Sequence, residues 1–405
     1  MNKKYFFILF LLSPIITFIY AFKNKSIYTY YTGVAFITYA ALTVIPQEGS
    51  DMYAFAEKIE NYNEFWALNN FQNNLSFFFS ELLSIEIVTK FLLLTSSIFT
   101  STHFIYTGVI GLITGIVMMN VYKFLIGKYR NNQSDLLCLF LLLLSSPIWT
   151  INGRFWLGFW IFTYALLLYI HKPNLKRYLL FLLPITFHTG WGFIFLIITF
   201  FHLTKNFKKI YFLYLLLIGI SFFIQSYAND IIIYLGGNVG GEAEEKSLTY
   251  AKHVVEKQTE LGGQSTSESP FFITLRTNLV RWGALILFTL NIIKRPFSRL
   301  RNMELFLLLM LSFVIAFYYV PSLGGRVSLV WSYIVLIYIA LEAYNRKLPY
   351  YYFRLILPIL VVNTFYAIRI ELVQTSLITY FGNPILFVIF GSDTVTTRDF
   401  LALFI

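Results

Sequence analysis

Residues 152–170, NGRFWLGFWIFTYALLLYI, are almost entirely apolar and aromatic, yet the stretch carries an arginine near its start. From Arg154 onward it has nearly the length of about 20 mostly apolar residues that a membrane-spanning helix needs. A charged side chain at the edge of such a helix costs free energy unless another group interacts with it. The stretch therefore predicts a membrane protein and raises the question of what Arg154 binds.

The composition of the whole chain agrees with this prediction. Of its 405 residues, 58% are hydrophobic and 13% are charged, and the mean hydropathy is +0.67. Soluble domains carry about 25% charged residues, so the composition indicates an integral membrane protein. The net charge of +11 is explained by Lys and Arg on cytoplasmic loops, and a nucleic-acid partner is not expected. The single cysteine, Cys138, cannot form an intrachain disulfide.

Apolar segments recur along the chain and predict an all-α, polytopic fold. We expect about 11–13 membrane helices, some of them re-entrant or broken, in a single transmembrane domain covering residues 1–405. The candidate segments are residues 5–22, 27–45, 83–100, 102–122, 136–151, 154–171, 178–202, 210–227, 271–293, 304–320, 326–344 and 353–370. The first has a basic start but no small-residue cleavage site, so we expect it to be a retained helix.

The charges of the connections indicate their orientation, because Lys and Arg favour cytoplasmic loops. Two long connections, residues 46–82 and 228–270, are acidic and are expected outside the membrane. We expect an amphipathic helix in 46–82, and either a lid or a loop without fixed structure in 228–270. The number of membrane crossings agrees with the sides assigned to these connections if part of residues 76–100 and the segment around His188 do not cross the membrane. Such broken pieces are tolerated when they are buried in protein or line a cavity.

Several arginines do not follow the orientation rule and are expected at the outer ends of helices. They are Arg154, Arg276, Arg281, Arg326 and Arg369. The planar guanidinium matches phosphate oxygens two at a time, so several on one side suit a pyrophosphate. Snorkelling or a structural ion pair is the alternative for each of them. Arg276 and Arg281 are about 140° apart around a helix, so we expect only one of these two to face the site.

Residues 187–193, FHTGWGF, contain a histidine between Pro184 and Gly190. A neutral His188 imidazole can accept the proton of an attacking hydroxyl, and a charged one can bind phosphate. An ordinary interhelical hydrogen bond is the alternative role. The other histidines do not cluster at the spacing of metal ligands, and we expect no metal ion.

Asp51 lies in residues 49–55, GSDMYAF, just beyond the second expected helix. A carboxylate there can act as a general base or bind a divalent ion beside a phosphate. It can instead be the N-cap of the amphipathic helix that follows.

Residues 321–331, PSLGGRVSLVW, repeat the pattern of the opening stretch. We expect a glycine-rich turn, followed by a helix that begins at Arg326 and whose N-terminal dipole favours an anion. An ordinary tight turn is the alternative. The chain has no Walker P-loop and no GxGxxG motif, so nucleotide hydrolysis and a bound cofactor are not expected.

In their order along the chain, these motifs resemble those of EpsG-type exopolysaccharide and Wzy-type O-antigen polymerases of bacteria. The matching residues, within about residues 49–345, are Gly49-Ser50-Asp51, Asn152-Gly153-Arg154, a basic loop, Phe187-His188, and Arg326 with Trp331 and Tyr333. Phe55, Phe155 and Gly190 stand where the family has Tyr, Gln and Ser. The resemblance therefore concerns the charged residues and His188 rather than those three positions.

The resemblance implies a GT-C-like, multi-pass enzyme of the bacterial cytoplasmic (inner) membrane, with its active site facing outside. Such polymerases transfer an oligosaccharide from undecaprenyl pyrophosphate to a sugar hydroxyl of another lipid-linked repeat unit. Arg154 and Arg326 would then bind the pyrophosphate, with Arg276 or Arg281 assisting, and fixed arginines would stabilise the departing charge. His188 and Asp51 are alternative bases. A chain-length regulator and a flippase are candidate partners.

Two other functions fit a polytopic protein with these charges. A flippase or transporter of lipid-linked oligosaccharide is expected to have charges deep within a two-sided cavity and internal repeats, and we find no repeat. An O-antigen ligase would use similar chemistry with lipid A core as the acceptor. A membrane acyltransferase would leave the outer arginines unexplained.

Overall fold

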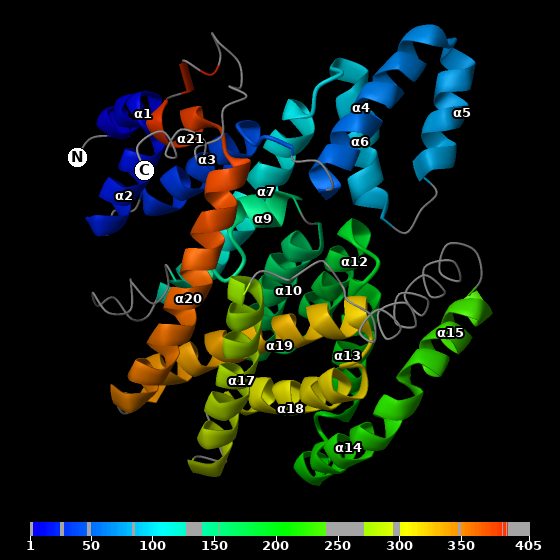
Figure 1. The fold of residues 1–405 in the computed structure, drawn as a ribbon, viewed down its shortest axis with the longest axis vertical. Coiled ribbons are helices and arrows are strands. Elements are labelled where there is room, and N and C mark those ends of the chain that lie inside the picture. The colour runs from blue at the N-terminus through cyan, green and yellow to red at the C-terminus, as the bar shows by residue number, and fades with distance from the viewer. Residues whose placement is uncertain are drawn as a thin grey trace. The chain divides into compact units, whose positions relative to one another are not determined.

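The computed structural model of the chain is all-α, as the sequence predicts (Figure 1). The structure describes residues 3–24, 28–46, 50–82, 86–126, 140–152, 154–239, 271–294, 300–346, 350–382, 384–385 and 387. Within these ranges the regular elements are helices, and one antiparallel bridge joins Val44 to Thr375. The expected lid in 228–270 is described only in part, as helix α15 (Ala228–Val239); residues 240–270, together with Gly49, Cys138 and Gly153, lie outside the described residues.

Four segments in the described part of the chain are long and apolar enough to cross a membrane. They are Phe104–Leu125, Ile210–Tyr227, Leu323–Glu342 and Arg354–Gln374. Shorter apolar helices cover Pro14–Lys23, Ile87–Phe99 and Trp191–Thr204. These helices indicate a multi-pass membrane protein, the class that the composition predicts.

Two of the expected segments are interrupted. Residues 5–22 form two helices, α1 (Lys3–Leu12) and α2 (Pro14–Lys23), because Ser13 caps α2 and Pro14 occupies its first position. A single helix over 5–22 is therefore wrong. Residues 178–202 are interrupted at His188, and a broken segment is predicted there.

The helices divide into two compact units. Unit 1 comprises residues 1–191 and 364–405. Besides α1 and α2 it contains α3 (Thr29–Leu42), α4 (Asp51–Leu68), α5 (Phe71–Leu82), α6 (Ile87–Phe99), α7 (Phe104–Ile126), α9 (Pro147–Asn152), α10 (Arg154–His171), α11 (Leu175–Leu179), η1 (Leu180–Leu182), α12 (Leu183–Phe187) and α21 (Leu377–Phe381).

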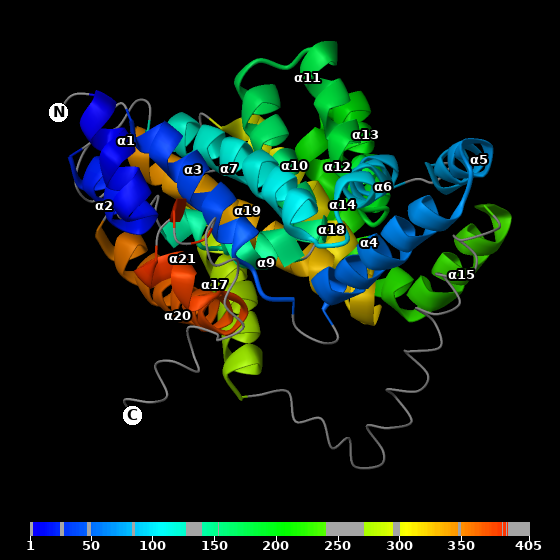
Figure 2. The same ribbon diagram turned by 90° about the horizontal axis from the view of Figure 1, so that it is seen from above.

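In unit 1, α3 and α7 lie side by side (Figure 2). Gly111 and Gly115 of α7 allow this approach: a Cβ on Gly115 would lie 3.1 Å from the Cα of Val34, and one on Gly111 would collide with Ala41. This is the small-residue packing that GxxxG motifs provide between membrane helices.

A second contact of unit 1 supports the region around Arg154. Helix α4 buries Met52, Phe55 and Ile59 along one face, the spacing of an amphipathic helix. These side chains join a core cluster that includes Tyr106 of α7 and Phe187 of α12. Helices α4, α7 and α12 are thus fixed to one another beside the start of α10.

Unit 2 comprises residues 192–363. It contains α14 (Ile210–Ile224), η2 (Gln225–Tyr227), α15, α17 (Phe271–Lys294), α18 (Arg301–Ala316) and α19 (Pro321–Arg346), with α13 (Trp191–Thr204) and α20 (Tyr350–Gln374) reaching its boundaries. Residues 330–342 of α19 are all buried. A helix that is covered on every side is the centre of a packed core, and α17 and α18 both pack against it.

Candidate functional site

Arg154 is the first residue of α10, and its side chain is 21% exposed. The guanidinium lies 4.8 Å from the centroid of the Phe55 ring of α4. A helix N-terminus carries partial positive charge, so a cation at this position needs a negative partner. The buried Nε of Arg154 has no hydrogen-bond partner among the described residues.

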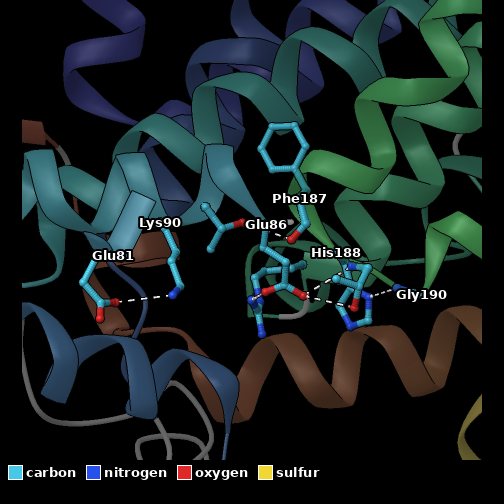
Figure 3. Close-up of polar contacts among 9 residues, drawn as sticks. Glu81, Glu86, Lys90, Phe187, His188 and Gly190 are labelled. Atoms are coloured by element: carbon cyan, nitrogen blue, oxygen red, sulfur yellow. Dashed lines mark hydrogen bonds and ion pairs between the residues drawn. The ribbon is translucent and has the colours of Figure 1, made fainter. Parts of the chain in front are cut away.

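The negative partner of Arg154 is Glu86, a residue that we did not predict. Its carboxylate is 14% exposed, and its Oε2 forms an ion pair and hydrogen bond with Nη1 of Arg154 (Figure 3). Its Oε1 accepts hydrogen bonds from the backbone N–H of Thr189 at 3.3 Å and from the Thr189 hydroxyl at 3.5 Å. Glu86 therefore connects the start of α10 to the chain just after α12.

The sequence does contain a signal for Glu86. The residue lies inside the apolar stretch 83–100, just before α6. Ionisable residues within membrane segments are expensive and usually belong to a site.

His188 follows the end of α12 and has an extended backbone. The N–H of Gly190 donates to Nδ1 of the His188 ring at 2.9 Å (Figure 3). The N–H of Trp191 donates to the His188 carbonyl at 3.1 Å. The Thr89 hydroxyl of α6 donates to the carbonyl of Phe187 at 3.0 Å. These bonds hold residues 187–190, which we call the His188 turn, against α6.

The hydrogen bond at Nδ1 determines which ring nitrogen of His188 carries the proton. A neutral imidazole has one donor and one acceptor nitrogen. Because Nδ1 accepts from Gly190, the neutral ring carries its proton on Nε2. This arrangement favours His188 as a hydrogen-bond donor to an oxygen over its predicted alternative role as a base.

Asp51 is the first residue of α4 and is exposed. The alternative interpretation of Asp51 as the N-cap is wrong, because the cap is Ser50, whose hydroxyl accepts from the N–H of Tyr53 at 3.2 Å. The buried hydroxyl of Tyr106 lies within electrostatic reach of Asp51, Arg154 and Glu86. Unit 1 thus gathers two carboxylates, one guanidinium and the His188 turn.

A separate ion pair lies farther along α6 (Figure 3). Lys90 of α6 contacts Glu81 of α5 at 3.3 Å, and the Tyr62 hydroxyl of α4 donates to the same carboxylate oxygen at 3.0 Å. Burial, together with the hydrogen bond and the charge of Glu81, raises the pKa of Tyr62. This group connects α4, α5 and α6 and is not joined by a hydrogen bond to Arg154.

The two arginines of α17 differ in their surroundings. Arg276 is 2% exposed; its Nε donates to Oδ1 of Asn363 at 2.9 Å, and its Nη2 donates to the Tyr333 hydroxyl. Arg281 is half-buried, donates to the carbonyl of Gly325 at 3.1 Å, and lies 5.9 Å from the ring centroid of Tyr318. Of these two, Arg281 is the one beside the start of α19.

Arg326 is exposed in the second turn of α19, which begins at Pro321. The predicted glycine-rich turn before the helix is therefore wrong, since Gly324 and Gly325 are helical. A Cβ on Gly324 would collide with the carbonyl groups of Phe317 and Tyr318. The glycine is needed for helix packing rather than for the approach of a ligand.

Arg369 is exposed on α20, within unit 1. Arg154, His188 and Asp51 also belong to unit 1, whereas Arg276, Arg281 and Arg326 belong to unit 2. Among the described residues, no group of three or more His, Cys, Asp or Glu is placed to hold a metal ion.

Comparison of the chain with protein-family models, curated proteins and solved structures finds no match.

Proposed function

We propose that the protein is a polysaccharide polymerase of the bacterial cytoplasmic membrane. It transfers an oligosaccharide from undecaprenyl pyrophosphate to a sugar hydroxyl of another lipid-linked repeat unit. The observation that supports this most is the setting of Arg154: a guanidinium at a helix N-terminus, held by Glu86 beside the His188 turn, in a multi-pass membrane protein.

The surroundings of Arg154 suit an anionic ligand. The positive end of the α10 dipole adds to the charge of the guanidinium, and the half-buried position strengthens electrostatic interactions relative to water. One Nη is bonded to Glu86 and the buried Nε has no hydrogen bond within the described chain. A diphosphate offers oxygens that match the guanidinium in the bidentate geometry that arginine favours.

The reaction needs stabilisation of negative charge where the diphosphate departs. Fixed positive groups aimed at that charge lower the barrier without reorganising during the reaction. We assign this role to Arg154, with the Nε2–H of His188 as a second donor. Asp51, exposed at the start of α4, remains a predicted alternative base for the acceptor hydroxyl.

Unit 2 supplies further arginines that we propose bind phosphate groups of the lipid-linked substrates. Arg326 is exposed and Arg281 is half-buried beside the start of α19. Arg276 is excluded from this role, because it is buried and bonded to Asn363 and Tyr333.

The finer membrane arrangement is also part of the proposal. We propose a GT-C-like fold with about 11–13 membrane segments and an active site that faces the outside. The short apolar helices α2, α6 and α13 would supply additional or re-entrant segments, consistent with the break at the His188 turn.

The test is a polymer assay with the purified protein in liposomes and chemically defined lipid-linked repeat units. The wild type should produce a ladder of lengthening saccharides without a nucleotide sugar. Arg154→Ala should lower kcat by about 10²–10³-fold, the usual effect of removing one group that stabilises transition-state charge. Arg177→Ala is the matched control, since the Arg177 side chain donates to the carbonyl groups of Leu168 and Lys172 at the other end of α10.

The outcomes separate the alternatives. Movement of the lipid-linked repeat across the membrane without a new glycosidic bond would indicate a flippase. Transfer only to lipid A core would indicate a ligase. Equal ladders from wild type and Arg154→Ala would show that Arg154 does not bind the leaving diphosphate.

A further inference from the structure

We infer that Glu86 is the general base of the transfer reaction, and that it becomes available when a diphosphate replaces it on Arg154. The inference rests on the proposed function and adds a catalytic residue to it. It comes from the contacts of Glu86 rather than from any sequence motif.

The two carboxylate oxygens of Glu86 have different partners. Oε2 is bonded to Arg154, and Oε1 accepts from the backbone and the hydroxyl of Thr189. Thr189 belongs to the His188 turn, which is itself held by Thr89 and Gly190. The Thr189 contacts can therefore keep the carboxylate in place when Arg154 changes partner.

A diphosphate competes directly with Glu86 for the guanidinium. It carries more negative charge than a carboxylate and can bond to two guanidinium nitrogens at once. When it binds, Oε2 of Glu86 loses its counter-ion and lies beside a second anion. Loss of a positive neighbour and gain of a negative one both favour protonation of a carboxylate. Substrate binding thus converts Glu86 into a proton acceptor.

The other candidate bases fit the role less well. Nδ1 of His188 accepts a hydrogen bond from Gly190, so the neutral ring presents an N–H at Nε2 and not a lone pair. Asp51 is exposed, and no hydrogen bond or ion pair joins it to Arg154 in the part of the chain that the structure describes. Of these three candidates, Glu86 is the one that is bonded both to Arg154 and to Thr189 of the His188 turn.

The acceptor hydroxyl oxygen forms a bond to the anomeric carbon of the donor sugar, and its proton passes to Oε2 of Glu86. The bond between that carbon and the diphosphate oxygen breaks, and its electron pair stays on the diphosphate held by Arg154. Glu86 then releases the proton to solvent, and re-forms its bond to Arg154 when the lipid diphosphate leaves.

The test is Glu86→Gln, which keeps the size of the side chain and an oxygen for Thr189 but cannot take up the proton. We expect kcat to fall by about 100-fold or more, because general bases typically contribute at least this factor to the rate. Binding of undecaprenyl pyrophosphate should be unchanged or tighter, because the competing carboxylate charge is gone. The acidic limb of the wild-type pH–rate profile should be absent from this variant, and Glu86→Asp should restore part of the rate.

Glu81→Gln is the matched control. Glu81 is also paired with a cation of α6, Lys90, at 3.3 Å, but has no hydrogen bond to Arg154. Its turnover and pH profile should match the wild type. Thermal unfolding of both variants shows whether either substitution disturbs the fold.

Three results would overturn the inference. They are turnover of Glu86→Gln within threefold of the wild type, a fall in diphosphate binding as large as the fall in kcat, and an unchanged acidic limb. In each case, polymer synthesis by the wild type would still support the proposed function. A wild type that binds no undecaprenyl pyrophosphate and makes no polymer would instead disprove the proposed function itself.

Discussion

Arg276 and Arg281 lie five positions apart on α17, and their contacts give them different roles. The guanidinium of Arg276 is buried and donates to Asn363 and to Tyr333, which are themselves buried. A buried charge is tolerated only when hydrogen bonds or opposite charges replace its water shell. Arg276 therefore stabilises unit 2, whereas Arg281 remains accessible to a ligand.

This difference predicts opposite effects of two alanine substitutions. Arg276→Ala removes the donors that the guanidinium supplies to the Tyr333 hydroxyl and to the Asn363 amide oxygen, and hydrogen bonds to charged groups contribute about 1.5–3 kcal/mol each. We expect a clear fall in the thermal unfolding midpoint in detergent. Arg281→Ala should leave the midpoint nearly unchanged but lower polymer synthesis. Equal midpoints for the two variants would contradict this assignment.

At the scale of residues, the sequence predicts which groups carry charge but not how they pair. Arg154, Asp51 and His188 are predicted site residues, and all three belong to unit 1. The partner of Arg154 was not predicted, because Glu86 lies 68 positions earlier in the chain. Arg154 and Glu86 come together because, in the folded protein, the start of α6 lies against α12 and the start of α10.

A local signal in the sequence marks one of the helix breaks. The number of membrane crossings predicts an interruption near His188, and the helix is interrupted there. The interruption at Ser13 and Pro14 was missed, although a serine followed by a proline is a helix start signal. Gly324 was assigned to a turn because glycine favours turns, but here it permits close helix packing, which depends on a neighbouring segment.

Gly158 links the packing of α10 to the His188 turn. A Cβ on Gly158 would collide with the indole of Trp191, whose Nε1–H donates to the carbonyl of Phe155 at 2.9 Å. The N–H of Trp191 also holds the His188 carbonyl. Displacement of this indole should therefore disturb both the fold and the site.

We expect Gly158→Ala to destabilise the protein by about 1–3 kcal/mol, the usual cost of overpacking a filled core, and to lower polymer synthesis. Thermal unfolding and turnover of the same preparation provide the measurement. Gly219→Ala on α14 is the control, because nothing lies within 4 Å of a Cβ at that position. At position 219, alanine has a higher helix propensity than glycine, so the substitution should stabilise the protein by up to about 1 kcal/mol. A Gly158→Ala variant as stable and active as the wild type would show that the indole can move freely.

At the scale of the whole chain, unit 1 is assembled from the two ends of the sequence. The end of α3 meets the end of α20: the N–H of Ile45 donates to Gln374 at 2.9 Å, and that of Ser376 donates to Thr43 at 3.1 Å. The Thr43 and Thr379 hydroxyls are 2.7 Å apart. Neither this closure nor the division into two units was predicted, because no linker or change of composition marks them in the sequence.

His103 makes the same junction sensitive to pH. Its Nε2 lies 3.2 Å from the carbonyl of Val44, which forms the bridge to Thr375. Burial lowers the pKa of His103, and the bond to Val44 opposes this only in part. The folded protein therefore favours the neutral ring, and the unfolded chain binds more protons below its ordinary pKa of about 6.5.

Because the folded-state pKa is the lower one, this contribution to stability is present above about pH 6.5 and is lost as the pH falls through the folded pKa. One such group can change the free energy of unfolding by at most about 1.4 kcal/mol per pH unit. We expect the unfolding midpoint to fall between neutral pH and pH 5. His103→Gln keeps an N–H donor for Val44 but cannot titrate, so its midpoint should change less over this range. If wild type and His103→Gln lose stability in parallel on acidification, other groups are responsible for the pH dependence of this junction.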